Sequence, residues 1–201
     1  MLKFTPAIAL ALLLQPLVQR LDTREAITYF IEDGKGVPGY RDSDRELATF
    51  ALNAWSRESS GKLKFTEARN RDTALIRFRW ISANDGLYGE TQRVSVNGKP
   101  GAIVYIMPQV SLQGEPLASR ATQDVLLRDT IVYLTCVHEL GHAVGLQHTG
   151  KFEDIMYYFG YGGNIVDYFM RYRSKLQART DIPKYSGLSG SDVQVLRNLY
   201  N

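Results

Sequence analysis

The chain has 201 residues, of which 44% are hydrophobic and 22% are charged, and its formal net charge is +3. Such a composition is typical of one globular domain, with or without a short N-terminal appendage. It excludes a disordered chain, a collagen-like fibre and a multi-span membrane protein, because the apolar residues do not gather into repeated long runs. The weak positive charge does not indicate a nucleic-acid partner, and a single cysteine excludes an intrachain disulfide.

The first twenty residues differ in character from the rest of the chain. Lys3 precedes an uncharged run over residues 4–19, whose most apolar part is residues 8–14. A basic residue followed by a short apolar stretch is typical of a secretory signal, whereas a membrane span needs about 20 apolar residues. We therefore expect residues 1–20 to be a signal peptide or N-terminal leader, residues 21–201 to form a single domain, and the protein to be secreted or periplasmic. A cytoplasmic protein that begins with an amphipathic helix is one alternative, and an uncleaved membrane anchor is another.

Beyond the leader, segments rich in β-branched and aromatic residues predict strands at residues 26–31, 63–66, 74–81 and 102–107. Residues 84–101 are rich in glycine and predict a turn-rich connection with room for one or two short strands. Apolar residues at helical spacing predict helices at residues 43–56, 123–146, 166–176 and 189–200. This order of elements predicts an α+β domain.

All three histidines lie within eleven residues, in the segment HELGHAVGLQH that runs from His138 to His148. Residues four apart lie on one face of a helix, so His138 and His142 can direct their rings at one ion. Gly145 can adopt a positive φ, end the helix and bring His148 to complete the set. Three imidazoles with an open fourth position are typical of catalytic zinc, whereas structural zinc has four protein ligands.

The remaining polar groups of this segment indicate what a zinc ion would do there. Cys136 lies about 200° around the helix from His138, so we expect a buried core residue and a fourth zinc position open to water. Zinc lowers the pKa of that water to about 7. Glu139 is the candidate general base, which takes the proton of the water and passes it to the leaving amine.

The complete pattern HExxHxxGxxH resembles that of the metzincin zinc endopeptidases. Met156, in the segment DIMYY eight residues after His148, resembles the methionine turn that lies beneath the zinc in that clan. The short interval, together with residues 188–200 and the segment FALNAW, is most similar to bacterial matrixins. The resemblance implies a metzincin-like zincin fold: a twisted mixed sheet of about four or five strands, an active-site helix, a methionine turn and a C-terminal helix.

Three departures from the matrixin pattern limit what the resemblance implies. No histidine remains for the second, structural zinc of animal matrixins, and no cysteine precedes residue 136 to act as a propeptide latch. Tyr158 stands where matrixins have proline, as in the astacins and serralysins. The resemblance therefore implies that Tyr158 is a fifth zinc ligand or a donor to the oxyanion, with a surface tyrosine as the alternative. Met156 is expected to form an apolar floor beneath the imidazoles.

The resemblance also implies that a protein or peptide substrate adds as a strand to an exposed sheet edge, for which residues 87–92 are the candidate. Residues 159–187 are either the outer wall of the pocket beyond the scissile bond or a helix that only packs on the lower half of the domain. The basic side chains of that segment predict a solvated helix surface, with attraction to acidic substrates as the alternative; they are Arg171, Arg173, Lys175, Arg179 and Lys184. We expect a monomer with one zinc ion and no stable membrane insertion unless the leader is uncleaved, and the sequence does not decide whether calcium binds.

The sequence thus favours a zinc metalloendopeptidase. Two alternatives remain open at this point. The first is a metal-binding or partner-binding domain of the same fold that lacks general proteolysis, which the presence of Glu139 disfavours. The second is a processing peptidase with a single protein target.

Overall fold

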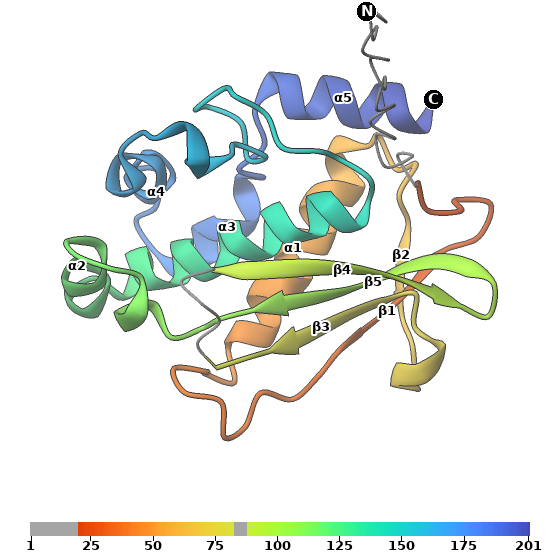
Figure 1. Ribbon diagram of the computed structural model, residues 1–201, viewed down its shortest axis with the longest axis horizontal. Helices are drawn as coiled ribbons and strands as arrows, with labels where there is room; N and C mark the ends of the chain where they lie inside the picture. The colour runs from red at the N-terminus through yellow and green to blue at the C-terminus, as the bar shows by residue number, and fades with distance from the viewer. Residues whose placement is uncertain (1–19, 83–87) are drawn as a thin grey trace, which may run out of the picture.

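A five-stranded sheet covered on one face by helices forms the body of the molecule in the computed structural model, which describes residues 20–82 and 88–201 (Figure 1). The strand order is β2-β1-β3-β5-β4, in which β4 is antiparallel to β5 and the other pairs are parallel. The strands are β1 (Ile27–Ile31), β2 (Phe65–Glu67), β3 (Ile76–Trp80), β4 (Gly89–Val96) and β5 (Lys99–Ile106). The expected α+β class with a mixed sheet is therefore confirmed.

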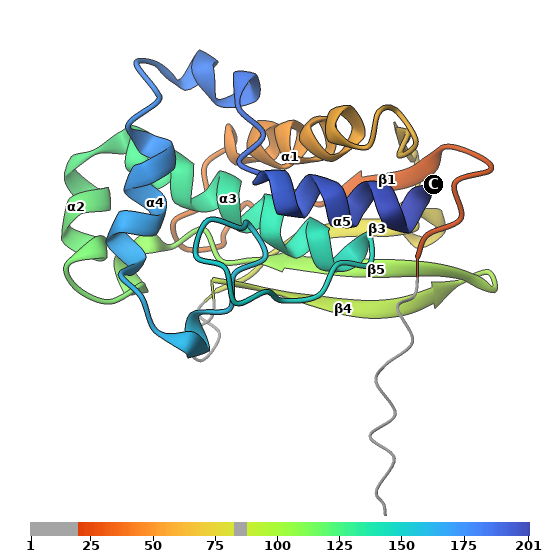
Figure 2. The ribbon, with the colours of Figure 1, turned by 90° about the horizontal axis from the view of Figure 1, so that it is seen from above.

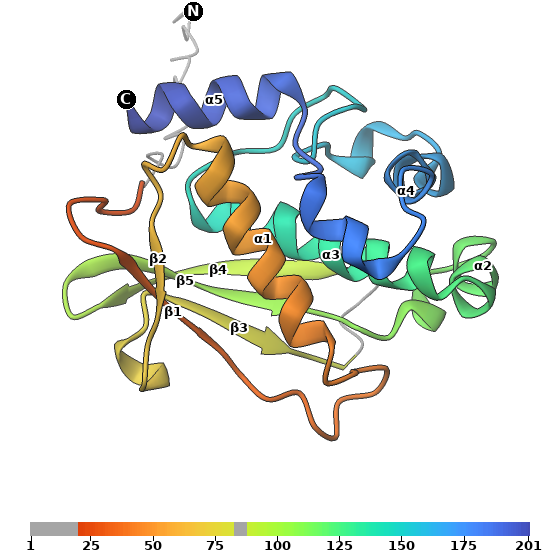
Figure 3. The same cartoon turned by 180° about the vertical axis from the view of Figure 1, so that it is seen from behind.

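The helices form further layers above this sheet. They are α1 (Asp44–Glu58), α2 (Leu117–Gln123), α3 (Val125–Ala143), α4 (Ile165–Arg173) and α5 (Gly190–Tyr200). Helices α1 and α3 lie directly on the sheet, and α5 lies beyond them with α4 at the other end (Figures 1 and 3). Seen from above, α3 runs along the sheet above β5 and β4, so its last turns face the edge strand (Figure 2).

Buried side chains of the sheet, of α1 and of α3 hold these two helices on the sheet. Every second residue of β3 is buried, namely Ile76, Phe78 and Trp80, and α3 is buried around nearly its whole circumference. Trp55 of α1 is fully buried and donates its indole N–H to the carbonyl of Val137, 2.9 Å away. The prediction that Cys136 is a core residue is confirmed, since its side chain is fully buried.

The turn-rich connection predicted at residues 84–101 is wrong in part, because residues 89–106 form a long β-hairpin. Strands β4 and β5 have eight residues each and meet at Asn97-Gly98, both of which have positive φ angles (51° and 76°). Paired positive φ values are what a two-residue hairpin requires, and Asn-Gly is its preferred sequence. The sheet edge expected at residues 87–92 overlaps β4, but the full length of this strand was not predicted, because it has mostly polar side chains and little alternation.

The helix predicted at residues 123–146 corresponds to α3, whereas the short helix α2, which ends at Gln123, was not predicted. Asp124 ends α2 and caps α3, where its carboxylate accepts a hydrogen bond from the backbone N–H of Leu127 at 3.0 Å. No helix in the described part of the chain is long and apolar enough to cross a membrane. The proposed leader, residues 1–19, lies outside the described residues, as do residues 83–87.

Candidate metal centre and active site

The last turns of α3 and the loop after it bring the three histidines together. The Nε2 atom of His148 lies 3.3 Å from that of His138 and 3.1 Å from that of His142. Gly145 has a φ of 107°, which a residue without Cβ adopts readily, and there the chain leaves the helix. Among the described residues, the possible ligand atoms of these three histidines all lie within 4.8 Å of one another. The structure thus places the three predicted metal ligands around one point.

Backbone carbonyls orient two of these rings. The Nδ1 atom of His138 lies 2.6 Å from the carbonyl oxygen of Ile155, and that of His142 lies 3.0 Å from the carbonyl oxygen of Leu146. A carbonyl only accepts, so each Nδ1 carries the proton and each Nε2 presents a lone pair to the centre. Burial lowers the pKa of His138 to about 3 and that of His142 to about 4. Both rings are therefore neutral near pH 7, as metal ligands must be.

This donor set fits a zinc ion. Lone pairs of neutral imidazoles that face one another at 3.1–3.3 Å repel unless a cation lies between them. A tetrahedral ion with Zn–N bonds of about 2.0–2.1 Å separates its nitrogen ligands by about 3.3 Å, which matches the observed separations. The chemistry and the spacing of the three rings therefore suit zinc.

Glu139 lies beside this centre in a confined position. Its side chain is only 7% exposed, and one carboxylate oxygen, Oε2, accepts a hydrogen bond of 2.8 Å from the hydroxyl of Thr91 on β4. Burial raises the pKa of Glu139 to about 7, and the hydrogen bond from Thr91 opposes part of this shift. A carboxylate with a pKa near neutrality is suited to accept and release a proton.

Met156 lies fully buried beneath α3, at the place that the resemblance implies for it. Its Sδ atom packs against Gly141, where an added Cβ would lie 2.4 Å from the sulfur. The preceding residue, Ile155, accepts from the His138 ring through its carbonyl, and its N–H donates to Asp192 of α5 at 2.7 Å. The hydroxyl of Tyr168 also donates to the Ile155 carbonyl, at 3.1 Å. The turn that holds Met156 therefore also orients one of the three rings.

Tyr158 stands at the rim of the same site. Its ring is 48% exposed and lies 5.0 Å from the His148 ring, centroid to centroid, with 32° between the planes. Gly160 allows this placement, since an added Cβ there would lie 2.1 Å from the Tyr158 ring. The structure therefore brings Tyr158 beside a histidine of the centre.

A cleft of about 460 Å³ opens between these residues, β4 and α4. The three histidines, Glu139 and Tyr158 line one part of it. Apolar and aromatic side chains line the rest, namely Tyr88, Leu134, Tyr157, Phe159, Ile165, Tyr168 and Phe169. The start of the segment 159–187 therefore lines this cleft, and its helix α4 also packs on α3, so the helix does more than pack on the lower half of the domain.

The basic side chains of that segment do not form a freely solvated face. Arg173 binds Asp124 with an N–O distance of 2.8 Å, Lys184 binds Asp181 at 2.7 Å, and Arg179 pairs with Asp129. The Arg173 and Arg179 contacts attach the segment to the start of α3, whereas Lys184 pairs within the segment and is exposed, as is Lys175, so the expectation of a solvated surface is corrected for Arg173 and Arg179 only.

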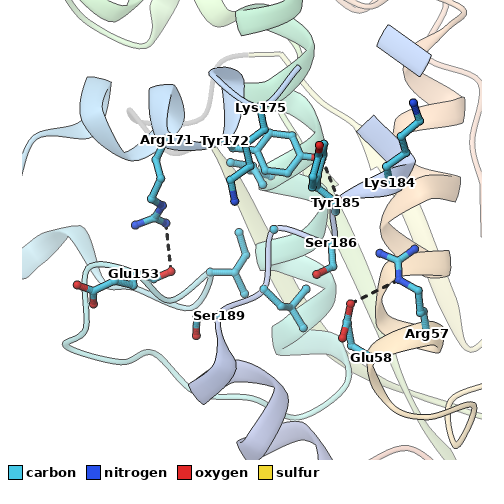
Figure 4. A pocket seen from close by; sticks show the side chains of 14 residues that line it. Arg57, Glu58, Glu153, Arg171, Tyr172, Lys175, Lys184, Tyr185, Ser186 and Ser189 are labelled. Atoms are coloured by element: carbon cyan, nitrogen blue, oxygen red, sulfur yellow. Dashed lines mark hydrogen bonds and ion pairs between the residues drawn. The ribbon is translucent and has the colours of Figure 1, made fainter. Parts of the chain in front are cut away.

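A second cavity, of about 420 Å³, lies on the far side of Leu134, the residue that lines both cavities. Arg57 reaches it from α1 and Arg171 from α4 (Figure 4). The Arg57 guanidinium lies 3.4 Å from the Glu58 carboxylate, and that of Arg171 donates to two backbone carbonyls. The lining is thus mostly polar and its guanidinium groups have partners, whereas the three histidines belong to the first cleft alone.

Three residues that matter for this geometry were missed from the sequence. Thr91 lies in the predicted edge segment, but its contact with Glu139 was not foreseen, and Gly141 and Asp192 support the turn at Met156 from two different helices. Each acts on a partner far away in the sequence. Of the three, only Asp192 carries a local sequence signal, because an acidic residue three positions after a serine such as Ser189 is typical of a helix cap.

A mixed sheet, a long helix that ends in two histidines and a glutamate, and a loop that returns a third histidine define a zinc metalloprotease domain of the metzincin type. The family model of the matrixins matches residues 21–165, well over half of the chain, and the chain therefore belongs to the matrixin family. The match ends where α4 begins. A comparison with curated protein sequences finds no match.

Proposed function

We propose that this protein is a zinc-dependent endopeptidase that hydrolyses peptide bonds of protein or peptide substrates. The observation that carries the proposal is the convergence of the three Nε2 atoms next to a buried carboxylate. His138, His142 and His148 would hold one zinc ion. Membership of the matrixin family supports the same metal and the same class of reaction.

Glu139 would be the general base. Bound zinc supplies a Lewis acid that lowers the pKa of water to about 7 and polarises the scissile carbonyl. The Glu139 carboxylate then takes a proton from the attacking water and delivers it to the nitrogen of the leaving amine. Burial raises the pKa of Glu139 to about 7 in the metal-free protein, which supports a role for this side chain in proton transfer.

Tyr158 would assist from the rim. Its phenol is exposed and next to His148, so it can donate a hydrogen bond to the oxygen that becomes negative when the carbonyl is attacked. Met156 and Gly145 would act through other residues, Met156 by packing under the rings and Gly145 by turning the chain toward His148.

The cleft supports a substrate that lies along β4. This strand is at the edge of the sheet, so its outer backbone groups can pair with an extended peptide. Residues 89–92 of the predicted edge are the first residues of β4 and Tyr88 directly precedes the strand, while residue 87 lies outside the described residues. The aromatic wall would accept a large apolar side chain next to the scissile bond.

Several expectations from the sequence remain part of the proposal. We propose a monomeric protein whose residues 21–201 form the catalytic domain and whose first twenty residues direct it to the periplasm or outside the cell. A processing peptidase with a single target would use the same site.

The test is zinc content together with cleavage of an unfolded protein such as reduced casein by the wild type and by Glu139→Ala. We expect one zinc ion in both proteins and cleavage only by the wild type, with a loss of at least about 10²-fold in rate. Wild-type protein that holds one zinc ion yet cleaves nothing would contradict general proteolysis and favour a metal-binding or single-target role.

A further inference from the structure

The edge strand β4 makes a side-chain contact with Glu139 that the general chemistry of the site does not require. The Thr91 hydroxyl lies 2.8 Å from Glu139 Oε2 and 2.7 Å from the backbone carbonyl oxygen of the same residue. Thr91 is half-buried, and 48 residues separate it from its partner. Both contacts therefore depend on the fold and not on local chain geometry.

Gly89 brings the strand close enough for this contact. Residues two apart on a strand face the same side, so Gly89 and Thr91 are both directed at α3. An added Cβ at Gly89 would lie 2.8 Å from Glu139 Cγ and 2.8 Å from the backbone oxygen of Tyr105. Any larger residue would displace the Glu139 side chain or the strand. The missing side chain of Gly89 thus leaves room for the Glu139 Cγ atom, and the Thr91 hydroxyl binds the Glu139 carboxylate.

We propose that Thr91 is a positioning residue, which holds the Glu139 carboxylate in one orientation beside the three histidines. This inference rests on the proposed role of Glu139 as the general base. A buried glutamate can adopt several rotamers. A general base that must reach both a water molecule and a leaving nitrogen works best when its side chain is fixed in one rotamer.

The hydroxyl can serve Glu139 in both of its protonation states. As a carboxylate, Glu139 accepts the hydroxyl hydrogen of Thr91 at Oε2. Once the other carboxylate oxygen of Glu139 has taken a proton, Oε2 is the carbonyl oxygen of the carboxylic acid and still accepts the Thr91 hydrogen, and the Glu139 backbone carbonyl offers the hydroxyl a second acceptor. The side chain then keeps a hydrogen-bond partner without moving while it carries the proton between water and amine.

The test compares Thr91→Val, which keeps the branched shape and removes the hydroxyl, with Thr91→Ser, which keeps the hydroxyl. Ser95→Ala removes an exposed hydroxyl from the same strand and is the matched control. We expect Thr91→Val to lower kcat about tenfold at unchanged KM and unchanged zinc content, because only the orientation of the base is lost. Thr91→Ser and Ser95→Ala should stay within about threefold of the wild type in kcat.

A measurement on the metal-free protein tests the contact without any activity. In a double-mutant cycle with Glu139→Ala, Thr91→Val should raise the unfolding equilibrium constant about tenfold when Glu139 is present. It should raise it by less than about threefold when Glu139 is absent. Equal effects in the two backgrounds would show that Thr91 acts only as part of the strand.

The outcomes separate this inference from the proposed function. If the wild type cleaves, Glu139→Ala does not, and Thr91→Val retains its kcat, the positioning role is wrong and the proposed endopeptidase stands. If zinc-loaded wild type cleaves nothing, or Glu139→Ala cleaves equally well, the general base is wrong and the role of Thr91 falls with it.

Discussion

Two glycines of the zinc motif have different physical roles. Gly145 adopts a φ of 107° and lets the chain turn toward His148. Gly141 is helical, and its missing side chain makes room for the sulfur of Met156 and for the Trp55 ring, which would lie 2.4 Å and 3.0 Å from an added Cβ. One glycine is thus required by the backbone and the other by packing, so the helix can lie directly on the methionine turn.

Tyr158→Phe tests the role of a single atom at the rim of the site, the phenol oxygen of Tyr158. Phenylalanine keeps the ring beside His148 and removes only the phenol oxygen, so folding and zinc content should be unchanged. Loss of an oxyanion donor lowers kcat by about 10²-fold or more. Steady-state kinetics and metal analysis check this, with Tyr161→Phe as the control because Tyr161 is more exposed and contacts the Tyr158 ring. An unchanged kcat in Tyr158→Phe would leave Tyr158 as a wall of the cleft.

Residues that act through spacing along the chain could be found from the sequence, and residues that act across the fold could not. The interval of four between His138 and His142 is fixed by helix geometry, and the turn at Gly145 explains His148. Thr91 has no comparable signal, because a threonine in a polar segment is ordinary until the fold sets it beside Glu139.

At the scale of elements, α5 supports the metal centre from a distance. The Asp192 carboxylate accepts from the N–H of Ser189 at 2.8 Å, which caps α5, and from the N–H of Ile155 at 2.7 Å. Ile155 in turn accepts from the His138 ring. The start of the C-terminal helix, the methionine turn and one zinc ligand are therefore linked through two hydrogen bonds.

Asp192→Ala should affect stability and metal binding together. The substitution removes the acceptor of the buried Ile155 N–H and of the half-buried Ser189 N–H, at a cost of about 3 kcal/mol in the free energy of unfolding. It also loosens the carbonyl that orients His138, which should weaken zinc binding about tenfold or more. Urea unfolding and zinc titration measure the two effects. The control is Asp167→Ala, which removes the equivalent first-turn carboxylate of α4 from an exposed position. Equal losses in both variants would contradict the link through Ile155.

Elements with an apolar periodicity were predicted closely, and the full extent of the polar edge strand was not. The strands β1, β3 and β5 and the helices α1 and α3 carry the apolar periodicity that burial demands. Strand β4 has one neighbour and a polar face, so its pairing with β5 and not its own pattern makes it a strand. The sequence therefore indicated where the sheet edge begins, at residues 87–92, but not how far it extends.

At the scale of the whole molecule, buried charge joins the far end of α3 to the segments around it. The Arg128 guanidinium binds the Asp44 carboxylate at the start of α1, with one N–O distance of 2.7 Å, and donates to the carbonyl of Gly39 at 2.6 Å. Asp129 pairs with Arg179, which lies beyond α4. One end of α3 is therefore held by ion pairs, and the other end carries His138 and His142, where a bound zinc ion would add a link to the loop of His148.

Zinc binding should accordingly add to the stability of the whole domain. A ligand that binds only the folded state raises the free energy of unfolding by about 4 kcal/mol when its free concentration is 1,000 times its Kd. We expect this increment for the wild type in urea unfolding with and without a zinc buffer, and its reversal by a chelator. His148→Ala should lose most of the increment because it removes a ligand. Its metal-free stability should stay close to that of the wild type, since His148 is exposed and its Nε2 faces other lone pairs. A variant that gains as much from zinc as the wild type does would show that the ion binds elsewhere.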